Sequence, residues 1–194
     1  GGTSVYWDFV ELPSQIMEHW ALEPEVLKSY ALHIDSGESI PDELIERLGV
    51  AATFNQGFET TEYLAACYLD LEWHGADAAA VEDVGAFEER AMEVIGKITT
   101  IDPRYKSTYF QHIFADEDYS AGYYVYLWAE VLDADGYEAF KENGVFDRQT
   151  AQSFRDNILA KGGTVEPMRL YEQFRGRAPE VMPLLRNRGL LVED

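Results

Sequence analysis

The chain has little cysteine and little positive charge. Cys67 is the only cysteine in 194 residues, so no internal disulfide can form and no cysteine pair can hold a structural zinc ion. Lysine and arginine number 15 against 36 aspartates and glutamates, which gives a formal net charge of -21. Proteins that bind nucleic acid or an anionic membrane surface use clustered basic residues. The sequence therefore predicts no nucleic acid and no membrane as a partner.

The sequence also lacks an apolar run of 18 residues and any long alternation of apolar and polar residues. The first absence argues against a membrane-spanning helix, and the second argues against β-strands. An apolar content of 46% and an aromatic content of 13% are too high for a disordered polypeptide. A protein of this length buries about 70% of its unfolded surface, so we expect one folded domain over residues 1–194.

Helical periodicity runs through most of the sequence and predicts an all-α fold. Pro13 predicts the start of a helix or a kink. Thr60 or Thr61 is predicted to cap a later helix that ends at Gly75, because threonine favours the first position of a helix and glycine the position after its end. A further amphipathic helix is predicted from Val81 to Lys97.

The most informative segment runs from Tyr119 to Trp128 and has the sequence Tyr-Ser-Ala-Gly-Tyr-Tyr-Val-Tyr-Leu-Trp. On a continuous helix Tyr119, Tyr123 and Tyr126 would share one face, which is predicted to point outward. Phenols in a row, with His112 shortly before them, suit hydrogen bonding to peptide carbonyls and to an oxyanion. The alternative is a half-buried aromatic stripe whose hydroxyls bind ordinary backbone partners. The opposite face is predicted to pack in the core: Ala121, Val125, Trp128 and Leu132.

Common catalytic motifs are absent from the sequence. The four histidines are too scattered for a His-Glu-x-x-His zinc motif, and there is no Gly-x-Ser-x-Gly elbow or glycine-rich phosphate loop. With 36 acidic residues, a close pair of carboxylates is expected by chance and does not indicate an acid–base pair.

Three sequence blocks nevertheless resemble one family of enzymes. They are Gly2-Thr3 followed by Asp8-Phe-Val-Glu-Leu-Pro-Ser-Gln15, then His112-Ile-Phe with the Tyr119–Trp128 segment, then Phe174-Arg-Gly-Arg-Ala-Pro179. In this order they resemble the thimet oligopeptidase and peptidyl-dipeptidase family of zinc metallopeptidases. Within the family the sequence is most similar to the bacterial peptidyl-dipeptidases, also called dipeptidyl carboxypeptidases, which release C-terminal dipeptides from short peptides. The resemblance implies the multi-helix C-terminal portion of a zincin-like helical catalytic domain.

The resemblance implies roles for five residues. Glu11 matches the glutamate that binds zinc, and Tyr126 matches the catalytic tyrosine that donates to the tetrahedral oxyanion. Tyr119 and Tyr123 match tyrosines that contact substrate, and His112 matches a catalytic-site histidine that binds the substrate backbone. Without the resemblance, Glu11 would be interpreted as a solvent-facing glutamate on an amphipathic helix and His112 as an ordinary loop histidine.

The sequence departs from the family pattern at two places. Asp116-Glu117-Asp118 stands where the family usually has the glycines of a flexible loop. The His-Glu-x-x-His motif, which in the family precedes the position of Glu11, does not occur, and with it two zinc ligands and the general base are missing. The resemblance thus implies one zinc ion in the intact enzyme. For these 194 residues alone we expect neither bound zinc nor catalysis.

The start at Gly1-Gly2, without an initiator methionine, leads us to expect a fragment. Its expected partners are short peptide substrates and the missing N-terminal part of the same polypeptide. The competing hypothesis is a non-catalytic helical module that binds peptides or a partner protein. Dipeptide release versus internal cleavage stays open, as does cytoplasm versus periplasm. Arg175 and Arg177 are candidate anchors for a substrate carboxylate, with an ordinary structural ion pair as the alternative.

Overall fold

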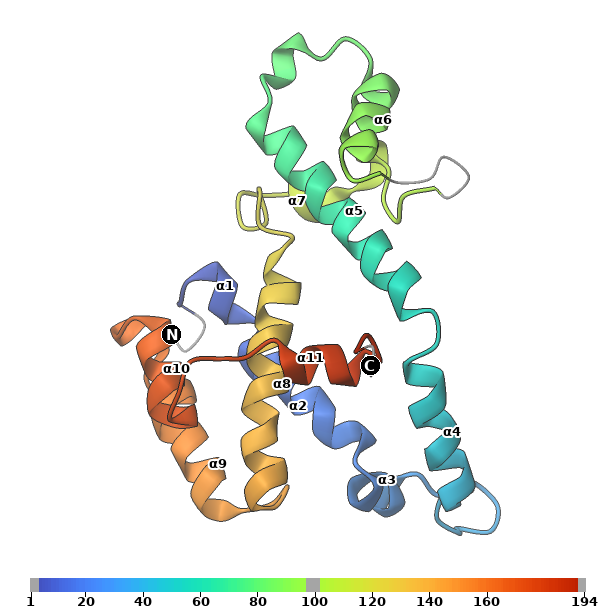
Figure 1. The fold of residues 1–194 in the computed structure, drawn as a ribbon, viewed down its shortest axis with the longest axis vertical. Coiled ribbons are helices and arrows are strands. Elements are labelled where there is room, and N and C mark those ends of the chain that lie inside the picture. The colour runs from blue at the N-terminus through green and yellow to red at the C-terminus, as the bar shows by residue number, and fades with distance from the viewer. Residues whose placement is uncertain (1–3, 97–101, 192–194) are drawn as a thin grey trace. The chain divides into compact units, whose positions relative to one another are not determined.

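The computed structural model describes residues 4–96 and 102–191, and these ranges are built from helices (Figure 1). The α-helices are α1 (Trp7–Val10), α2 (Leu12–Leu22), α3 (Pro24–Tyr30), α4 (Asp42–Ala52), α5 (Gln56–Gly75), α6 (Val84–Val94), α7 (Gln111–Phe114), α8 (Val125–Asn143), α9 (Arg148–Phe154), α10 (Pro167–Arg175) and α11 (Met182–Asn187). Short helical turns are η1 (Ala78–Ala80), η2 (Ser107–Tyr109), η3 (Arg155–Leu159) and η4 (Gly162–Thr164). Within the described ranges the only extended pairing is an isolated bridge between Leu32 and Ser39. The all-α prediction is confirmed.

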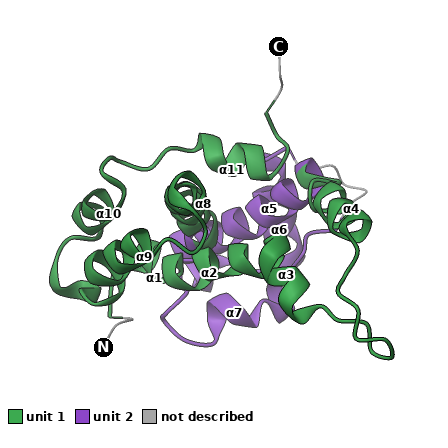
Figure 2. Ribbon diagram, turned by 90° about the horizontal axis from the view of Figure 1, so that it is seen from below, with its two compact units in different colours: residues 1–56, 126–194 green, residues 57–125 purple. Residues whose placement is uncertain are grey.

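The protein divides into two compact units (Figure 2). Unit 1 comprises Gly1–Gln56 and Tyr126–Asp194, and unit 2 comprises Gly57–Val125. The prediction of one domain over residues 1–194 stays a prediction, and each unit is described by itself. Among the described residues, no helix combines the length and the apolar character needed to cross a bilayer.

Unit 1 is organised around α8, with α9 and α10 on one side and α1 and α2 against another (Figures 1 and 2). Gly136 on α8 allows the close packing, because a Cβ atom there would lie 3.3 Å from Ile16 Cδ1 and 3.5 Å from Phe174 Cε1. The core side chains of this unit are Phe9, Leu12, Ile16, Leu132, Tyr137, Ala139, Phe140, Phe154, Ile158, Leu170, Tyr171 and Phe174.

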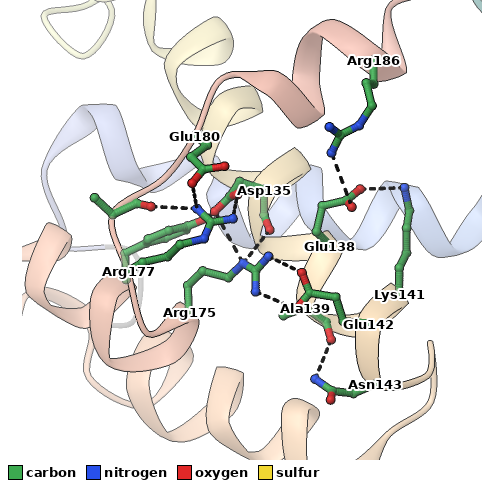
Figure 3. A network of polar contacts seen from close by, with 12 residues as sticks. Asp135, Glu138, Ala139, Lys141, Glu142, Asn143, Arg175, Arg177, Glu180 and Arg186 are labelled. Carbon is green, nitrogen blue, oxygen red and sulfur yellow. Dashed lines mark hydrogen bonds and ion pairs between the residues drawn. The ribbon is translucent and has the colours of Figure 1, made fainter.

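A buried carboxylate joins α8 to the segment around α10 (Figure 3). Asp135 is 0% exposed, and its carboxylate accepts hydrogen bonds from Arg177 Nη2 at 2.5 Å and from the Tyr171 hydroxyl at 2.7 Å. Arg175 donates to the Asp135 backbone oxygen at 3.1 Å and to both carboxylate oxygens of Glu142, at 2.9 and 2.7 Å. Both arginines are therefore engaged in ion pairs within unit 1, as the structural alternative predicts.

Unit 2 has its own smaller core, formed by α5, α6 and the segment around η2 and α7. Trp73 on α5 lies 4.1 Å from Phe87 on α6, measured between ring centroids, and its Nε1 donates to Ser107 Oγ at 2.8 Å. Glu88 on α6 accepts the Ser107 backbone N–H at 2.8 Å. Cys67 is buried, and this burial raises the pKa of its thiol to about 11. The side chain therefore stays a protonated thiol at neutral pH, which is the unreactive form.

Several helix ends confirm the predictions and others correct them. Pro13 lies in the first turn of α2, and α5 ends at Gly75, both as predicted. The predicted threonine cap of α5 is wrong, because the helix begins at Gln56 and Thr61 Oγ1 donates to the Gly57 carbonyl inside it, at 2.8 Å. The start predicted at Val81 is also wrong, since the Asp83 carboxylate caps α6 by accepting the Ala86 N–H at 3.0 Å. The predicted end at Lys97, and Gly2-Thr3 of the first sequence block, lie outside the described residues.

Candidate functional site

The Glu11 carboxylate lies at the junction of α1 and α2 in unit 1. Glu11 lies between Val10, which ends α1, and Leu12, which begins α2. Pro13 lies in the first turn of α2. Its half-buried carboxylate accepts a hydrogen bond from Ser14 Oγ to Oε2 at 2.9 Å. A cavity of about 430 Å³ adjoins it, lined by Val5, Phe9, Val10, Glu11, Pro13, Ser14, Ile158 and Leu159. A carboxylate oriented by a hydroxyl can serve as one oxygen ligand of a cation.

Tyr126 begins the part of α8 that belongs to unit 1. Gln15, one helical turn after Glu11, donates from Nε2 to the Tyr126 backbone oxygen at 3.2 Å. The side chain of Tyr126 is half-buried. Unit 1 therefore links the helix that follows Glu11 directly to the backbone of Tyr126, which matches the tyrosine that the resemblance associates with the oxyanion.

Unit 2 brings His112, Tyr119 and Tyr123 together. The ring centroids of His112 and Tyr119 are 4.2 Å apart, and those of His112 and Tyr123 are 5.6 Å apart in a T-shaped arrangement. His112 is exposed, whereas Tyr123 is 6% exposed. Burial raises the pKa of the Tyr123 hydroxyl above its ordinary value.

The prediction that the tyrosines share one helical face is wrong. Residues 118–124 form turns, and α8 begins only at Val125. Ala121 has φ 55°, which a right-handed helix does not contain, and a Cβ atom on Gly122 would lie 3.3 Å from the Tyr119 Cα. Tyr123 consequently points into unit 2 and is buried rather than directed outward.

Two residues of the predicted apolar face also differ, because Ala121 lies in the turn before α8 and is only half-buried. Trp128 is 50% exposed, although Val125 and Leu132 are buried as predicted. All three residues lie on α8, and with 3.6 residues per turn Trp128 stands about 60° around the helix from Val125, at the edge of the buried face.

Sequence reasoning missed three residues of α5 that hold this turn segment. Asp70, which is 0% exposed, accepts the backbone N–H groups of Ala121 and Tyr123 at 2.9 and 2.8 Å. His74 contacts Asp70, and the Tyr63 hydroxyl donates to the Tyr123 carbonyl at 2.5 Å. The available signal was one aspartate inside the apolar run from Ala65 to Leu71.

The described residues fit a zinc ion only in part. Glu11 offers one oxygen ligand of a kind that zinc accepts. Across residues 4–96 and 102–191, however, no three histidine, cysteine, aspartate or glutamate residues are placed to hold a metal ion together. Catalytic zinc sites use three protein ligands and leave one position for water or substrate. These residues by themselves therefore do not form such a site.

Comparisons with known proteins give one consistent result. Residues 1–190 match the family model described as Peptidase family M3. The sequence is 47% identical over 193 residues to "Dipeptidyl carboxypeptidase" of Escherichia coli (strain K12), an alignment that covers 98% of this protein and 28% of that one. It is 46% identical over 191 residues to "Dipeptidyl carboxypeptidase" of Salmonella typhimurium, covering 97% and 28%. "Oligopeptidase A" of Escherichia coli is 40% identical over 195 residues, covering 98% and 28%. The 194 residues thus span 28% of the length of these relatives.

Proposed function

The chain belongs to peptidase family M3, and on this basis we propose that it forms part of the catalytic domain of a zinc-dependent peptidyl-dipeptidase. The dipeptidyl carboxypeptidases, at 47% and 46% identity, resemble it more than the oligopeptidase A at 40%. This difference favours release of C-terminal dipeptides from short peptides. The observation that carries the proposal is the α1–α2 junction, where the oriented Glu11 carboxylate is followed by Gln15, which binds the backbone of Tyr126.

Glu11 contributes one oxygen ligand to zinc in the proposed enzyme. The other ligands and the general base come from a preceding part of the same polypeptide, which is the protein partner that we propose. A zinc ion bound there would supply an acidified water molecule as the nucleophile. The Ser14 hydroxyl shares its hydrogen between Glu11 Oε2 and the Glu11 backbone oxygen, each 2.9 Å away, and this contact limits the orientations that the carboxylate can take.

The tyrosines and His112 act on the peptide. Tyr126 donates its phenol hydrogen to the oxyanion that develops on the cleaved carbonyl. His112 and Tyr119 bind the substrate backbone, and Tyr123, which is 6% exposed, packs against His112 and supports this ring cluster in unit 2.

Two polypeptides test the proposal, the 194-residue protein and a polypeptide of the relatives' full length that contains it. Each is incubated with zinc and a pentapeptide that is blocked at its N-terminus and has a free C-terminal carboxylate. The products are identified by mass spectrometry. We expect the full-length polypeptide to release the C-terminal dipeptide and the 194-residue protein to release nothing above a blank. If the full-length polypeptide binds the peptide without cleaving it, the proposed peptidase activity is contradicted and a non-catalytic peptide-binding module is supported.

Tyr126 and its neighbour Tyr124 form a matched pair for the catalytic role. Tyr126→Phe in the full-length polypeptide should lower kcat by about 10²- to 10³-fold with little change in KM, because the hydroxyl donates in the transition state. Tyr124 is an exposed phenol in the same segment, and Tyr124→Phe should leave both constants unchanged. Equal rates for wild type and Tyr126→Phe would remove Tyr126 from the mechanism.

A further inference from the structure

Asp70 is a fully buried carboxylate in the middle of α5, within unit 2. It is 0% exposed and lies in the apolar run from Ala65 to Leu71. A carboxylate in such a place is strongly unfavourable unless its oxygens are hydrogen-bonded. The groups that bind it therefore indicate what this residue does.

Both Asp70 oxygens bind the backbone of the tyrosine turn, residues 119–124. Oδ1 accepts the Ala121 N–H at 2.9 Å, and Oδ2 accepts the Tyr123 N–H at 2.8 Å. His74, one helical turn further along α5, places Nδ1 2.7 Å from Asp70 Oδ1. The Asp70 backbone oxygen also lies 2.9 Å from Nδ1, so two acceptors face this nitrogen and it carries the ring hydrogen. A protonated Nδ1 cannot accept the Ala121 N–H, which lies 3.2 Å away, so this N–H donates to Asp70. Charge-assisted hydrogen bonds of this kind are about twice as strong as neutral ones.

Tyr63 binds the same turn from the preceding part of α5. Its hydroxyl donates to the Tyr123 carbonyl at 2.5 Å, and its ring stacks on the Tyr123 ring with centroids 5.5 Å apart. Positions 63, 70 and 74 fall on one face of a helix, because they are separated by seven and four residues. One face of α5 therefore holds both the backbone N–H and the backbone carbonyl of Tyr123.

The turn adopts a conformation that its own sequence does not favour. Ala121 has φ 55°, and the left-handed region is unfavourable by about 1–2 kcal/mol for a residue with a Cβ atom. Such a conformation persists when surrounding contacts determine it. Here the Ala121 N–H is bound by Asp70, so α5 supplies the contact that keeps the turn in this shape.

We propose that Asp70 is a positioning residue, which acts with His74 and Tyr63 to aim the tyrosine turn at the peptide substrate. This inference rests on the proposed function. Asp70 touches no substrate. It fixes the backbone of Ala121–Tyr123, and with it the cluster in which the Tyr119 and Tyr123 rings contact His112. Since this cluster binds substrate, loss of the positioning acts on KM, whereas loss of Tyr126 acts on kcat.

The test uses the full-length polypeptide and the variants Asp70→Asn, His74→Leu and His74→Gln. Asparagine keeps the volume of Asp70 and one acceptor, but it turns an NH₂ group toward a backbone N–H. Leucine removes the donor that His74 offers to Asp70, whereas glutamine retains an N–H donor and should restore the behaviour of the wild type. Glu88→Gln is the matched control, because Glu88 also accepts a backbone N–H in unit 2, from Ser107 rather than from the tyrosine turn.

Two readouts are measured on every variant. Hydrogen exchange of the Ala121 and Tyr123 amides should be slow in the wild type and at least about tenfold faster in Asp70→Asn, from the loss of one or two hydrogen bonds. KM for the blocked pentapeptide, together with the Kd of a non-cleavable analogue, should rise at least about fivefold in Asp70→Asn and His74→Leu, with kcat within about threefold of the wild type. Glu88→Gln should change neither the exchange of these two amides nor KM.

The outcomes separate this inference from the proposed function. Fast exchange of the two amides in the wild type would overturn the positioning, whatever the activity. Faster exchange in Asp70→Asn with unchanged KM and Kd would also overturn it, leaving a purely structural carboxylate. If Asp70→Asn does not fold, His74→Leu and Tyr63→Phe give the same comparison from milder changes. A wild type that binds the analogue without cleaving any peptide would contradict the proposed function, while the Kd values still test the positioning.

Discussion

Replacing the buried carboxylate of unit 1 gives a stability prediction that the structure defines closely. Asp135→Asn retains the shape of the residue and removes its charge. The carboxylate is 0% exposed and lies 2.5 Å from Arg177 Nη2, 2.7 Å from the Tyr171 hydroxyl and 3.6 Å from Arg175 Nε (Figure 3). The variant leaves two guanidinium groups beside an uncharged amide, whose NH₂ group must face either Arg177 or the Tyr171 hydroxyl.

The contacts of the two arginines set the size of the loss. Removing one partner of a buried ion pair lowers the free energy of unfolding by about 3–5 kcal/mol. The Arg177 side chain is 35% exposed, so water can partly solvate its charge, while that of Arg175 is 9% exposed and keeps Glu142 as a partner. We therefore expect the low end of the range, about 3 kcal/mol. That is a large part of the roughly 5–15 kcal/mol typical of folded domains.

Glu142→Gln is the matched control, because Glu142 binds the same Arg175 from the surface. The Glu142 side chain is 54% exposed, and because it binds Arg175 through both oxygens we place this pair at the upper end of the about 0–1 kcal/mol typical of surface pairs. Urea unfolding of the 194-residue protein is followed by tryptophan fluorescence in a Trp73→Phe background. The remaining tryptophans, Trp7, Trp20 and Trp128, then all report on unit 1.

The comparison is a difference between two variants and so does not depend on absolute stability. Asp135→Asn should lose at least about 2 kcal/mol more than Glu142→Gln at pH 7, with unchanged m-values. Losses equal within about 0.5 kcal/mol would refute the reasoning, because additivity errors are of that size. They would mean that the burial of Asp135 contributes nothing beyond a surface pair.

Further predictions concern pH and the tyrosine turn. Burial raises the pKa of Asp133 from 3.8 to about 6, against the opposing effect of its contact with His19. The native state thus holds the Asp133 proton more tightly than the unfolded state does. The protonated carboxyl therefore contributes to the free energy of unfolding below about pH 4, and this contribution is lost as pH rises to about 6. Asp133→Asn should abolish this pH-dependent loss of stability, which is at most about 3 kcal/mol. Urea unfolding at a series of pH values measures it. Gly122→Ala should destabilise unit 2 by about 1–3 kcal/mol, because its Cβ atom would meet the Tyr119 backbone at 3.3 Å. Ala121→Gly should stabilise unit 2 by about 1 kcal/mol, since glycine accepts φ 55° without strain. Thermal unfolding followed by Trp73 fluorescence, in a background where Trp7, Trp20 and Trp128 are replaced by phenylalanine, measures both. No difference between the two variants would contradict the role given to the turn.

The sequence predicted the parts of the fold that local physics determines. Pro13 marks the start of α2 because proline has no N–H to lose in the first turn, and Gly75 ends α5 for the reasons that favour glycine after a helix. Periodicity was sufficient to predict an all-α protein, because each amphipathic helix repeats its pattern over several turns.

The tyrosine turn could not be predicted in the same way. Its shape depends on hydrogen bonds to Asp70, which is 51 residues from Ala121 in sequence. No local pattern records a contact over such a separation, and the spacing of the tyrosines alone favours a helix. Asp135 is a similar case, because no sequence pattern distinguishes this buried aspartate from the other acidic residues, of which the sequence has 36 in total.

The candidate site was predicted from matched residues rather than from geometry. Resemblance to the family pointed to Glu11 and Tyr126, whose roles stay proposals. The structure adds what holds them: Ser14 on the Glu11 carboxylate, and Gln15 on the Tyr126 backbone. Glu11 lies at the break between α1 and α2, and the directions of the Ser14 and Gln15 side chains do not follow from the order of residues.

Zinc content measured by elemental analysis tests the central claim most directly, that Glu11 completes a metal site built by a longer polypeptide. The 194-residue protein and the full-length polypeptide are both dialysed against metal-free buffer. We expect near-zero zinc in the 194-residue protein, one zinc ion per full-length polypeptide, and loss of that ion in Glu11→Ala. One tightly held zinc ion in the 194-residue protein, or full zinc content in the Glu11→Ala full-length polypeptide, would contradict this claim.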